Sequence, residues 1–471
     1  MAKYQKYAEY QDSGIEWLGQ IPNHWAMSKL RYLFDFSKGL SITKENLQDE
    51  GIPCVNYGEV HSKYGFEVNP KKHPLKYVSE NYLKTSENAL LNIGDFIFAD
   101  TSEDLKGSGN FTHLVGDERI FAGYHTVIAR PHNANSSRFY AYLFDSKEFR
   151  SQIQLAVKGV KVFSITQAML RSADAWLPSP DEQTQIANFL DHETAQIDTL
   201  IAKQEKLIEL LKEKRQAVIS HAVTKGLNPD VTMKYSGVEW LGQVPEHWKV
   251  APIKRIIHLM EQGKSPECEN IPATSEQWGV LKTSCVNNGV FHSQQNKALP
   301  EHTKPHTQYQ VKAGDVLMSR ASGSINLIGS VALVPNDVQE NLLLSDKIFR
   351  IHLTKDCDAK FFTLLMATPY MRTLIERAIS GAEGMANNIT KTSILEFVSA
   401  IPPLTEQLEL VDYISQKVQT FDLLVLNATK AIELMQERRT ALISSAVTGK
   451  IDVRHWQNPN KNNDAKTELG A

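Results

Sequence analysis

Three residues that resemble part of a phosphate-binding loop, Gly263-Lys264-Ser265, are the first place where this sequence could do chemistry. In such a loop another glycine stands five residues before Gly263, but this position holds His258. A second glycine-rich run, KGSGNF at 106–111, lacks the spacing of a dinucleotide-binding loop. Neither segment therefore predicts a nucleotide site.

Other catalytic and metal-binding patterns are missing as well. The sequence has no GxSxG elbow, no Asn-Pro-Pro-aromatic or Asp-Pro-Pro-aromatic motif of amino-methyltransferases, and no acidic pair whose setting marks a general acid and base. Its histidines form no HExxH or HxH pattern, and its cysteines form no CxxC pair. We expect no catalytic residue, no metal and no cofactor, and four structural thiols: Cys54, Cys268, Cys285 and Cys357.

The composition sets the broad class. A chain of 471 residues, 42% of them hydrophobic, is long enough for two or three ordinary globular cores. No apolar run is long enough for a membrane helix, and the N-terminus has no apolar signal segment, so a cytoplasmic protein is expected. The net charge of −3 predicts that any DNA-binding surface is a local basic patch.

The chain carries the same pattern twice. SGIEWLGQIPNHW at 13–25 returns as SGVEWLGQVPEHW at 236–248, with ten of thirteen positions identical. The four tryptophans of these segments could be platforms for bases or sugars, or they could pack against a nearby helix. Because they recur in the shared parts of the two halves, packing is the favoured interpretation.

Further paired segments follow in the same order in each half, and they place the elements that must position any site. The middles, 26–176 and 249–400, keep similar lengths but differ at most positions, so a shared frame carries different surfaces. The paired segments are 37–41 with 261–265, 93–102 with 313–322, 139–153 with 361–375, 177–183 with 401–407, and 214–226 with 438–450.

Each half ends in a long helix with a coiled-coil seam. No Pro or Gly interrupts 181–225 or 404–448, and apolar residues recur there at alternating spacings of three and four. The two helices are expected to pair with each other as an antiparallel couple; packing onto the helix's own domain and pairing between two chains remain alternatives. The seam residues are Leu190, Ile197, Ile201, Ile208, Leu211, Val218, Ile414, Phe421, Val425, Ile432, Met435 and Leu442.

This ordered duplication resembles the specificity (S) subunit of type I restriction-modification systems. The resemblance covers nearly the whole chain and rests on the paired SGxEWLGQxPxHW segments, the LPxPxxEQ-like junctions and the KRxAxISxAVTxG helix ends. It implies an α+β fold in which two similar α/β target-recognition domains are separated by a pair of long antiparallel coiled-coil helices, with a pseudo-twofold internal repeat.

The repeat and the resemblance together give expected domain limits. Each recognition domain begins with its tryptophan-containing segment, and each is followed by one long helix. The limits are 1–180 for the first domain, 181–226 for the central helix, 227–403 for the second domain, 404–450 for the C-terminal helix, and 451–471 for a polar tail, disordered from about Asn458.

The resemblance also implies the function. Each domain would read one half of a split, asymmetric sequence in double-stranded DNA, and the helix pair would set the gap between the halves. Two methyltransferase (M) subunits would dock on the shared parts, and motor-nuclease (R) subunits would join through that core. The chain itself would be non-catalytic and would not contact a membrane.

The residues alone leave two alternatives open. One is a coiled-coil scaffold whose globular ends bind proteins, with no role on DNA, and the near-neutral charge is compatible with it. The other is a complete enzyme with a degenerate catalytic motif.

The candidate DNA contacts lie in loops next to short strands, because loops carry variable recognition. Arg320 is the first candidate for a base edge, since arginine can bind guanine O6 and N7 together, whereas the lysines are expected to hold phosphates. In the first domain the candidates are Lys38, Ser41, Asn56, Tyr57, Thr101, Ser102, Lys106, His125, Lys158 and Lys161. In the second they are Lys264, Ser265, Lys282, Thr283, Arg320, Ser322, Ser324, Lys347, Asn387 and Asn388.

Overall fold

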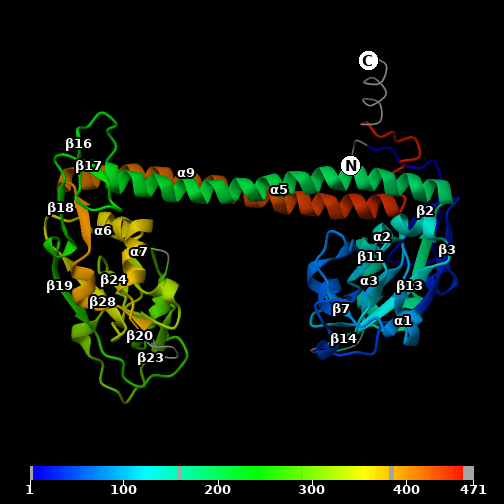
Figure 1. The fold of residues 1–471 in the computed structure, drawn as a ribbon, viewed down its shortest axis with the longest axis horizontal. Helices are drawn as coiled ribbons and strands as arrows, with labels where there is room; N and C mark the ends of the chain where they lie inside the picture. The colour runs from blue at the N-terminus through cyan, green and yellow to red at the C-terminus, as the bar shows by residue number, and fades with distance from the viewer. Residues whose placement is uncertain (1–3, 158, 160–161, 288, 381–386, 460–471) are drawn as a thin grey trace. The chain divides into compact units, whose positions relative to one another are not determined.

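The computed structural model describes residues 4–157, 159, 162–287, 289–380 and 387–459, and it divides the chain into two compact units. Unit 1 combines Met1–Glu205 with Lys430–Ala471, and unit 2 is Lys206–Thr429. Both units contain strands and short helices, and each receives one part of each long helix (Figure 1). Among the described residues, no helix has both the length and the apolar composition needed to cross a membrane.

Unit 1 is built on two sheets, and both faces of strand β9 are buried. Phe96 and Phe98 of β9 pack in one core cluster with the helices, whereas Ile97 and Ala99 pack in the cluster of the second sheet. The first sheet has the order β4 (Phe34–Lys38), β13 (Thr126–Pro131), β9 (Phe96–Ala99), β11 (Phe111–Leu114), β6 (Phe66–Val68). The second has the order β7 (Lys76–Val78), β5 (Ile52–Val55), β12 (Ile120–Ala122), β8 (Leu90–Leu91).

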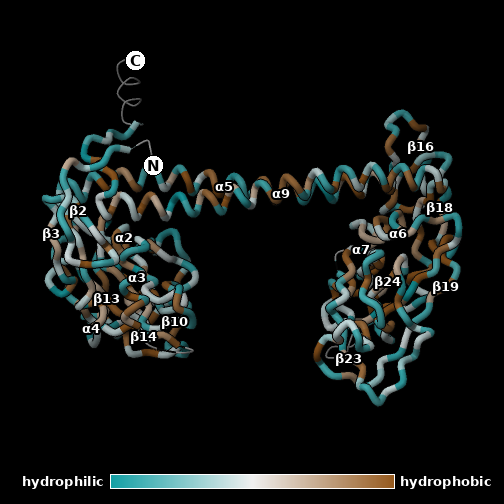
Figure 2. Tube along the Cα trace, turned by 180° about the vertical axis from the view of Figure 1, so that it is seen from behind, coloured by the Kyte–Doolittle hydropathy of each residue, from teal (hydrophilic) through white to brown (hydrophobic). Residues whose placement is uncertain are grey.

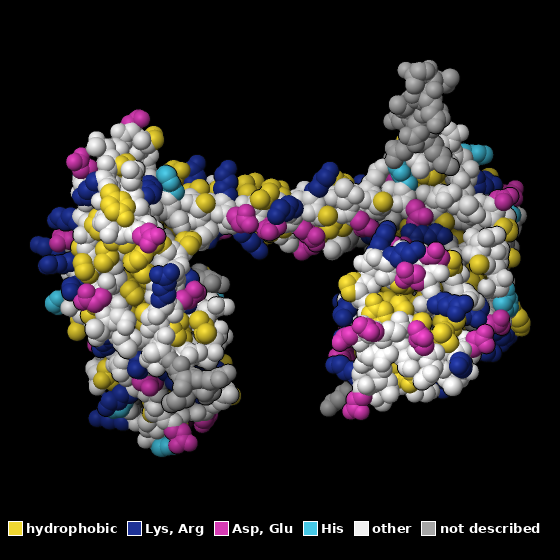
Figure 3. Space-filling view, viewed as in Figure 1, with side chains coloured by type: hydrophobic (Ala, Val, Ile, Leu, Met, Phe, Trp, Pro, Cys, Tyr) yellow, Lys and Arg dark blue, Asp and Glu magenta, His cyan; other side chains and the backbone are white. Residues whose placement is uncertain are grey.

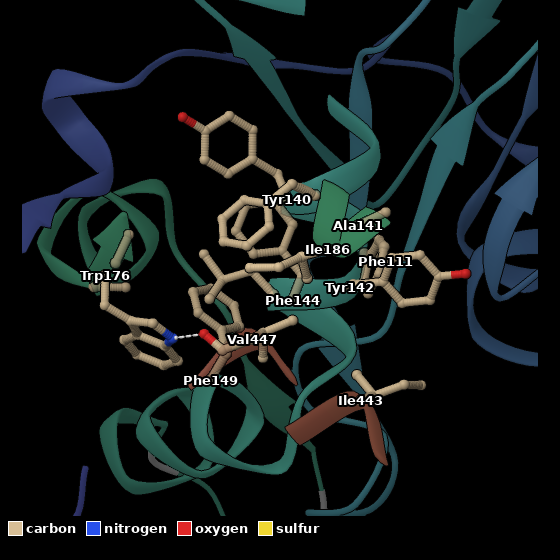
Figure 4. Close-up of a cluster of buried hydrophobic side chains, with 14 of the residues drawn as sticks. Phe111, Tyr140, Ala141, Tyr142, Phe144, Phe149, Trp176, Ile186, Ile443 and Val447 are labelled. Atoms are coloured by element: carbon tan, nitrogen blue, oxygen red, sulfur yellow. Dashed lines mark hydrogen bonds between the residues drawn. The ribbon is translucent and has the colours of Figure 1, made fainter. Parts of the chain in front are cut away.

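Aromatic side chains fill the core between the first sheet and its covering helices, α2 (Ser137–Asp145) and α3 (Lys147–Ala156). The ring of Phe144 lies 5.0 Å from that of Phe96 and 5.3 Å from that of Phe98, both edge to face. The same core receives the end of the C-terminal helix, where Trp176 Nε1 donates a hydrogen bond to the carbonyl oxygen of Val447 at 2.6 Å (Figure 4).

Unit 2 repeats this frame. Its first sheet has four strands that pair antiparallel in the same sequence as β4, β13, β9 and β11 of unit 1. Helices α6 (Ala359–Met366) and α7 (Pro369–Ala378) take the places of α2 and α3. The sheet has the order β19 (Ile257–Gln262), β28 (Ile348–Leu353), β24 (Val316–Ser319), β26 (Val331–Leu333). The smaller sheet has the order β23 (Asn296–Ala298), β20 (Gly279–Leu281), β27 (Leu342–Leu343).

The two Gly-Asp turns place a buried ion pair in each unit. Asp95 Oδ2 accepts a hydrogen bond from the backbone N–H of Asn92, and the side chain is also held by Arg130 at 2.8 Å. In unit 2, Asp315 closes the equivalent turn and binds Arg350 at 3.0 Å. Asp95 is 1% exposed and Arg350 is 6% exposed, and a charge this deeply buried must be paired and hydrogen-bonded, so the ion pair fixes the turn at the head of β9 and of β24.

The long helices α5 (Pro180–Lys225) and α9 (Leu404–Val447) pack against each other in antiparallel sense within each unit. In unit 1, Ile197 of α5 shares a core cluster with Leu442 of α9, and Arg439 binds Asp198 at 3.1 Å. In unit 2, Arg215 binds Asp422 at 3.5 Å. All the seam residues named from the sequence are buried or half-buried, and hydropathy alternates along both helices (Figure 2).

The paired tryptophan-containing segments pack against the starts of the long helices. Trp25 is 2% exposed and donates from Nε1 to Glu182 in the first turn of α5 at 3.2 Å. Trp248 is fully buried, and the carboxylate of Glu406 in α9 accepts its N–H at 3.0 Å. These two tryptophans therefore pack as expected; Trp17 and Trp240 are 38% and 49% exposed, and Trp17 reaches Trp176 at a ring distance of 6.0 Å.

Part of the expected polar tail instead packs on unit 1. Ile451 and Val453 are buried, and the ring of Trp456 lies 5.6 Å from that of Phe189 in α5. The backbone N–H of Asp452 also donates to the carbonyl oxygen of Gln5 at 2.8 Å. Two apolar side chains and one aromatic side chain in this segment explain the packing, which the overall polarity of the tail obscured; residues 460–471 lie outside the described residues.

Candidate nucleic-acid interface

Four loops of unit 1 meet at one end of its sheets. Backbone hydrogen bonds join the loop after β4 to the β12–β13 turn (Gly39 N to Thr126 O, 3.2 Å) and the loop after β5 to the same turn (Tyr57 N to Tyr124 O, 3.3 Å). The segment after β9 joins it through Asp100 N and His125 O at 3.1 Å. This loop end of unit 1 therefore brings together candidates that are far apart in the sequence.

A glycine makes this close approach possible in both units. A Cβ atom at Gly39 would overlap the carbonyl oxygen of Gly123, and one at Gly263 would overlap the carbonyl oxygen of Leu344. These are the glycines of the paired segments 37–41 and 261–265, so the sequence repeat marks a backbone contact rather than a phosphate cradle.

The candidates of unit 1 differ in their exposure. Asn56 and Ser102 are buried, so the short polar side chains at these positions pack inside the loop end. His61 lies beside Ser102 (Nε2 to Oγ 3.3 Å), and its ring is 5.2 Å from that of Tyr57. Lys38, Ser41, Lys106 and His125 are exposed, Tyr57 and Thr101 are half-buried, and Lys158 and Lys161 lie outside the described residues.

The carboxylate of Asp100 belongs to this loop end, although the sequence reasoning did not include it. Its Oδ1 lies 3.1 Å from Nδ1 of His125, a residue held in the left-handed backbone region at φ 55°. Burial raises the pKa of the Tyr57 hydroxyl, and the charges of Glu103, Asp104 and Asp100 raise it further. The electrostatic environment of Tyr57 is therefore acidic.

The corresponding loop end of unit 2 gathers a second set of candidates. Ser265 and Asp346 are hydrogen-bonded through their side chains, and Gly263 N donates to Ser345 O at 3.1 Å. Strand β25 (Ala321–Ser322) pairs antiparallel with β29 (Asn387–Asn388), which brings these two asparagines next to the segment after β24. Lys264, Ser265, Ser324 and Lys347 are exposed, whereas Lys282, Thr283, Arg320, Ser322, Asn387 and Asn388 are half-buried.

Arg320 stands at the centre of this second loop end. Its Nη1 donates to the carbonyl oxygen of Asp346 at 3.3 Å, and its guanidinium lies 5.9 Å from the ring centre of Phe349. Its backbone N–H donates to the carbonyl oxygen of Lys347 at 2.8 Å. Within the described part of the chain, neither Arg320 nor Lys347 forms an ion pair with a carboxylate, so both keep donors for another partner.

The space-filling view shows cations and carboxylates interspersed over the visible faces of both units (Figure 3). This mixture agrees with the net charge of −3. Any DNA contact in this chain therefore depends on local side chains such as those of the two loop ends.

The thiols have the character of structural cysteines. Cys54, Cys285 and Cys357 are buried, and burial raises the pKa of each thiol to about 12. A thiol with so high a pKa is a poor nucleophile and a poor metal ligand at neutral pH. The described residues hold no group of three or more His, Cys, Asp or Glu side chains arranged to bind a metal ion.

Comparison with known proteins identifies the family. The model of the type I restriction modification DNA specificity domain matches twice, at residues 22–210 and 245–434. The chain belongs to the type I restriction-modification specificity family. Each match contains the two sheets and the loop end of one unit.

Curated specificity subunits include relatives that match over most of their length and one that matches over about a third of it. The EcoKI specificity subunit of Escherichia coli (strain K12) is 23% identical over 451 residues, which are 94% of this chain and 92% of that protein. The StySPI specificity subunit of Salmonella potsdam is 22% identical over 448 residues, with 94% and 92% covered. The EcoEI specificity subunit of Escherichia coli is 32% identical, but over 44% of this chain and 34% of that protein.

Solved structures of this family share the fold. The HsdS subunit from Thermoanaerobacter tengcongensis aligns with a TM-score of 0.52 at 14% identity, covering 92% of this chain and 98% of that one. A chain from a structural study of type I restriction-modification complex assembly and conformational transition aligns with a TM-score of 0.59 at 15% identity, covering 92% and 99%. The expected α+β fold, with two similar domains and a pair of long antiparallel helices, is confirmed.

Proposed function

We propose that this chain is the non-catalytic, DNA-reading subunit of a type I restriction-modification complex, in which each recognition domain reads one half of a bipartite, asymmetric target. One observation carries this proposal: the same strand frame occurs twice, and it presents different side chains at equivalent loop positions. Asp100 and His125 stand in unit 1 where Arg320 and Lys347 stand in unit 2. An asymmetric target requires two domains that share a fold but present different side chains to the bases.

The shared parts of the chain provide the proposed docking surface. The tryptophan-containing segments, the Glu-Gln junctions and the helix ends are alike in both halves, so they offer two equivalent places for two methyltransferase subunits. Motor-nuclease subunits would join that core. We propose domain limits of 1–180 and 227–403, with helices 181–226 and 404–450 holding the two readers at a fixed distance along the duplex.

A binding experiment with the assembled complex tests the proposal. The chain is combined with its methyltransferase subunits and incubated with a library of randomised duplexes, and the bound duplexes are sequenced. We expect two short conserved segments separated by a gap of constant length. Binding without any recovered motif would instead support a scaffold without sequence recognition, and methylation or cleavage by the purified chain alone would refute the non-catalytic assignment.

A further inference from the structure

The turns after β9 and β24 have the same backbone connections in both units. Asp100 N donates to His125 O, and Arg320 N donates to Lys347 O. The next connection also matches, because Ile165 N donates to Asp100 O at 2.8 Å and Ile389 N donates to Arg320 O at 3.0 Å. Asp100 and Arg320 are therefore structurally equivalent.

The chemistry at these equivalent positions is opposite. In unit 2, the guanidinium and the ammonium can only donate hydrogen bonds, which suits the O6 and N7 acceptors of guanine. In unit 1, a carboxylate takes the place of the guanidinium and accepts hydrogen bonds. Its side chain is 33% exposed, and Oδ2 has no hydrogen-bond partner among the described residues, so this oxygen is available to a ligand.

We propose that Asp100 is a specificity-determining residue of unit 1 that accepts a hydrogen bond from the exocyclic amino group of adenine or cytosine in the major groove. This inference rests on the function proposed above and adds the base chemistry of one half-site. His125 is the positioning residue, because its ring holds Oδ1 at 3.1 Å and leaves Oδ2 for the base.

The carboxylate also provides discrimination against the wrong base. Guanine presents two acceptors in the major groove, and placing them against a carboxylate leaves lone pairs facing each other without a proton. Lys38 and Lys106 are exposed in the loops of this unit, and their positive charges offset part of the electrostatic cost of bringing a carboxylate to DNA. Unit 1 is therefore expected to reject guanine at the base that Asp100 contacts.

The test is a selection from randomised duplexes with the assembled complex carrying Asp100→Ala, Asp100→Asn or the control Glu103→Ala. Glu103 is an exposed acid three residues beyond Asp100, so its removal changes the charge of the loop by the same amount. For Asp100→Ala we expect about 5- to 150-fold weaker discrimination at one base pair of one half-site. The other half-site and the Glu103→Ala motif stay unchanged.

The asparagine variant tests whether the base contacts an acceptor at the position of Oδ2. With the amide oxygen held by His125, the amide nitrogen takes the place of Oδ2 and can only donate, so Asp100→Asn is expected to lose the preference for a base with an amino group and to tolerate guanine. An unchanged motif for Asp100→Ala, or equal weakening on all sequences, overturns the inference. Circular dichroism and recovery of the other half-site show whether each variant is folded. If the wild-type complex selects no sequence motif, the proposed function is refuted, and the inference about Asp100 is refuted with it.

Discussion

The carboxylate of Glu182 accepts hydrogen bonds from Trp25 Nε1 at 3.2 Å and from the Tyr7 hydroxyl at 2.6 Å. Nε2 of His24 lies 2.8 Å from the other carboxylate oxygen. Burial and the neighbouring carboxylate raise the pKa of Tyr7, so this hydroxyl keeps its proton and acts as a donor. Glu182 thus connects the repeated tryptophan-containing segment to the first turn of α5, and this contact accounts for the co-occurrence of the PxHW and EQ motifs in each half.

Replacement of this carboxylate is expected to destabilise unit 1. Glu182→Ala leaves the indole N–H and the tyrosine hydroxyl without their acceptor in a buried site, at a cost of about 1.5–3 kcal/mol in the free energy of unfolding. This loss of stability is measured by urea unfolding, monitored through tryptophan fluorescence. Glu205→Ala, at an exposed position of the same helix, is the control, and equal midpoints for the two variants would contradict this role.

The buried ion pairs of the Gly-Asp turns are expected to be more sensitive. Asp95→Ala removes a carboxylate that is 1% exposed, together with its hydrogen bonds to Arg130 and to the backbone N–H of Asn92; because Arg130 is partly exposed, we expect a loss of about 2–4 kcal/mol from the free energy of unfolding. Thermal unfolding is the measurement, and Glu80→Ala, at an exposed acid elsewhere in unit 1, is the control. A loss below about 0.5 kcal/mol for Asp95→Ala would show that the pair does not hold the turn.

His113 predicts a pH dependence of stability. Burial and the positive charge of Arg138 lower the pKa of its ring from 6.5 to about 3, and neither ring nitrogen has a hydrogen-bond partner among the described residues. As the pH falls below about 6.5, the unfolded chain binds a proton that the folded chain excludes until about pH 3. The stability contributed by neutral His113 is therefore complete above pH 6.5 and decreases between 6.5 and 3.

The variant His113→Phe isolates this effect. Phenylalanine keeps the stack on Phe96, where the ring centres are 4.9 Å apart, and cannot be protonated. Relative to the wild type, its free energy of unfolding is expected to gain up to about 1.4 kcal/mol per pH unit as the pH falls through this window. A constant difference between the two proteins from pH 7 to pH 4 would show that His113 does not titrate as expected.

The two exposed tryptophans test the proposed docking surface. Trp17 and Trp240 are 38% and 49% exposed, and both lie in the segments shared by the two halves. Trp240→Ala is expected to weaken assembly with the methyltransferase subunits, measured by analytical ultracentrifugation, with Leu259→Ala at another exposed apolar position as the control. A fully assembled variant with an altered DNA motif would contradict this placement.

Much of the frame could be predicted from the sequence because it depends on periodic or repeated features. The seam of α5 and α9 follows from apolar spacing alone, and the paired segments 93–102 and 313–322 mark the Gly-Asp turns. The ion-pair partners are less regular: Arg130 is one residue after Ala129, which pairs with Phe96, whereas Arg350 is one residue before Ile351, which pairs with Val316. Strand register decides which arginine reaches the carboxylate.

The loop ends were harder to predict because the burial of a short polar side chain depends on which loops pack over it. Asn56 and Ser102 were expected to face a ligand, yet other loops cover them. Asp100 is not among the residues predicted from the sequence, yet the paired segments place it opposite Arg320. The repeat itself therefore marks Asp100 as the counterpart of the first candidate in the other half.

The length of the gap between the two half-sites tests the central claim, that two unlike readers are held apart by the helix pair. Seven residues inserted after Glu205 and seven after Thr429 keep the seam in phase and lengthen both helices by about 10 Å. The proposal predicts that the assembled complex then selects the same two half-sites with a gap longer by about 3 base pairs. An unchanged gap, or altered half-sites, would contradict it.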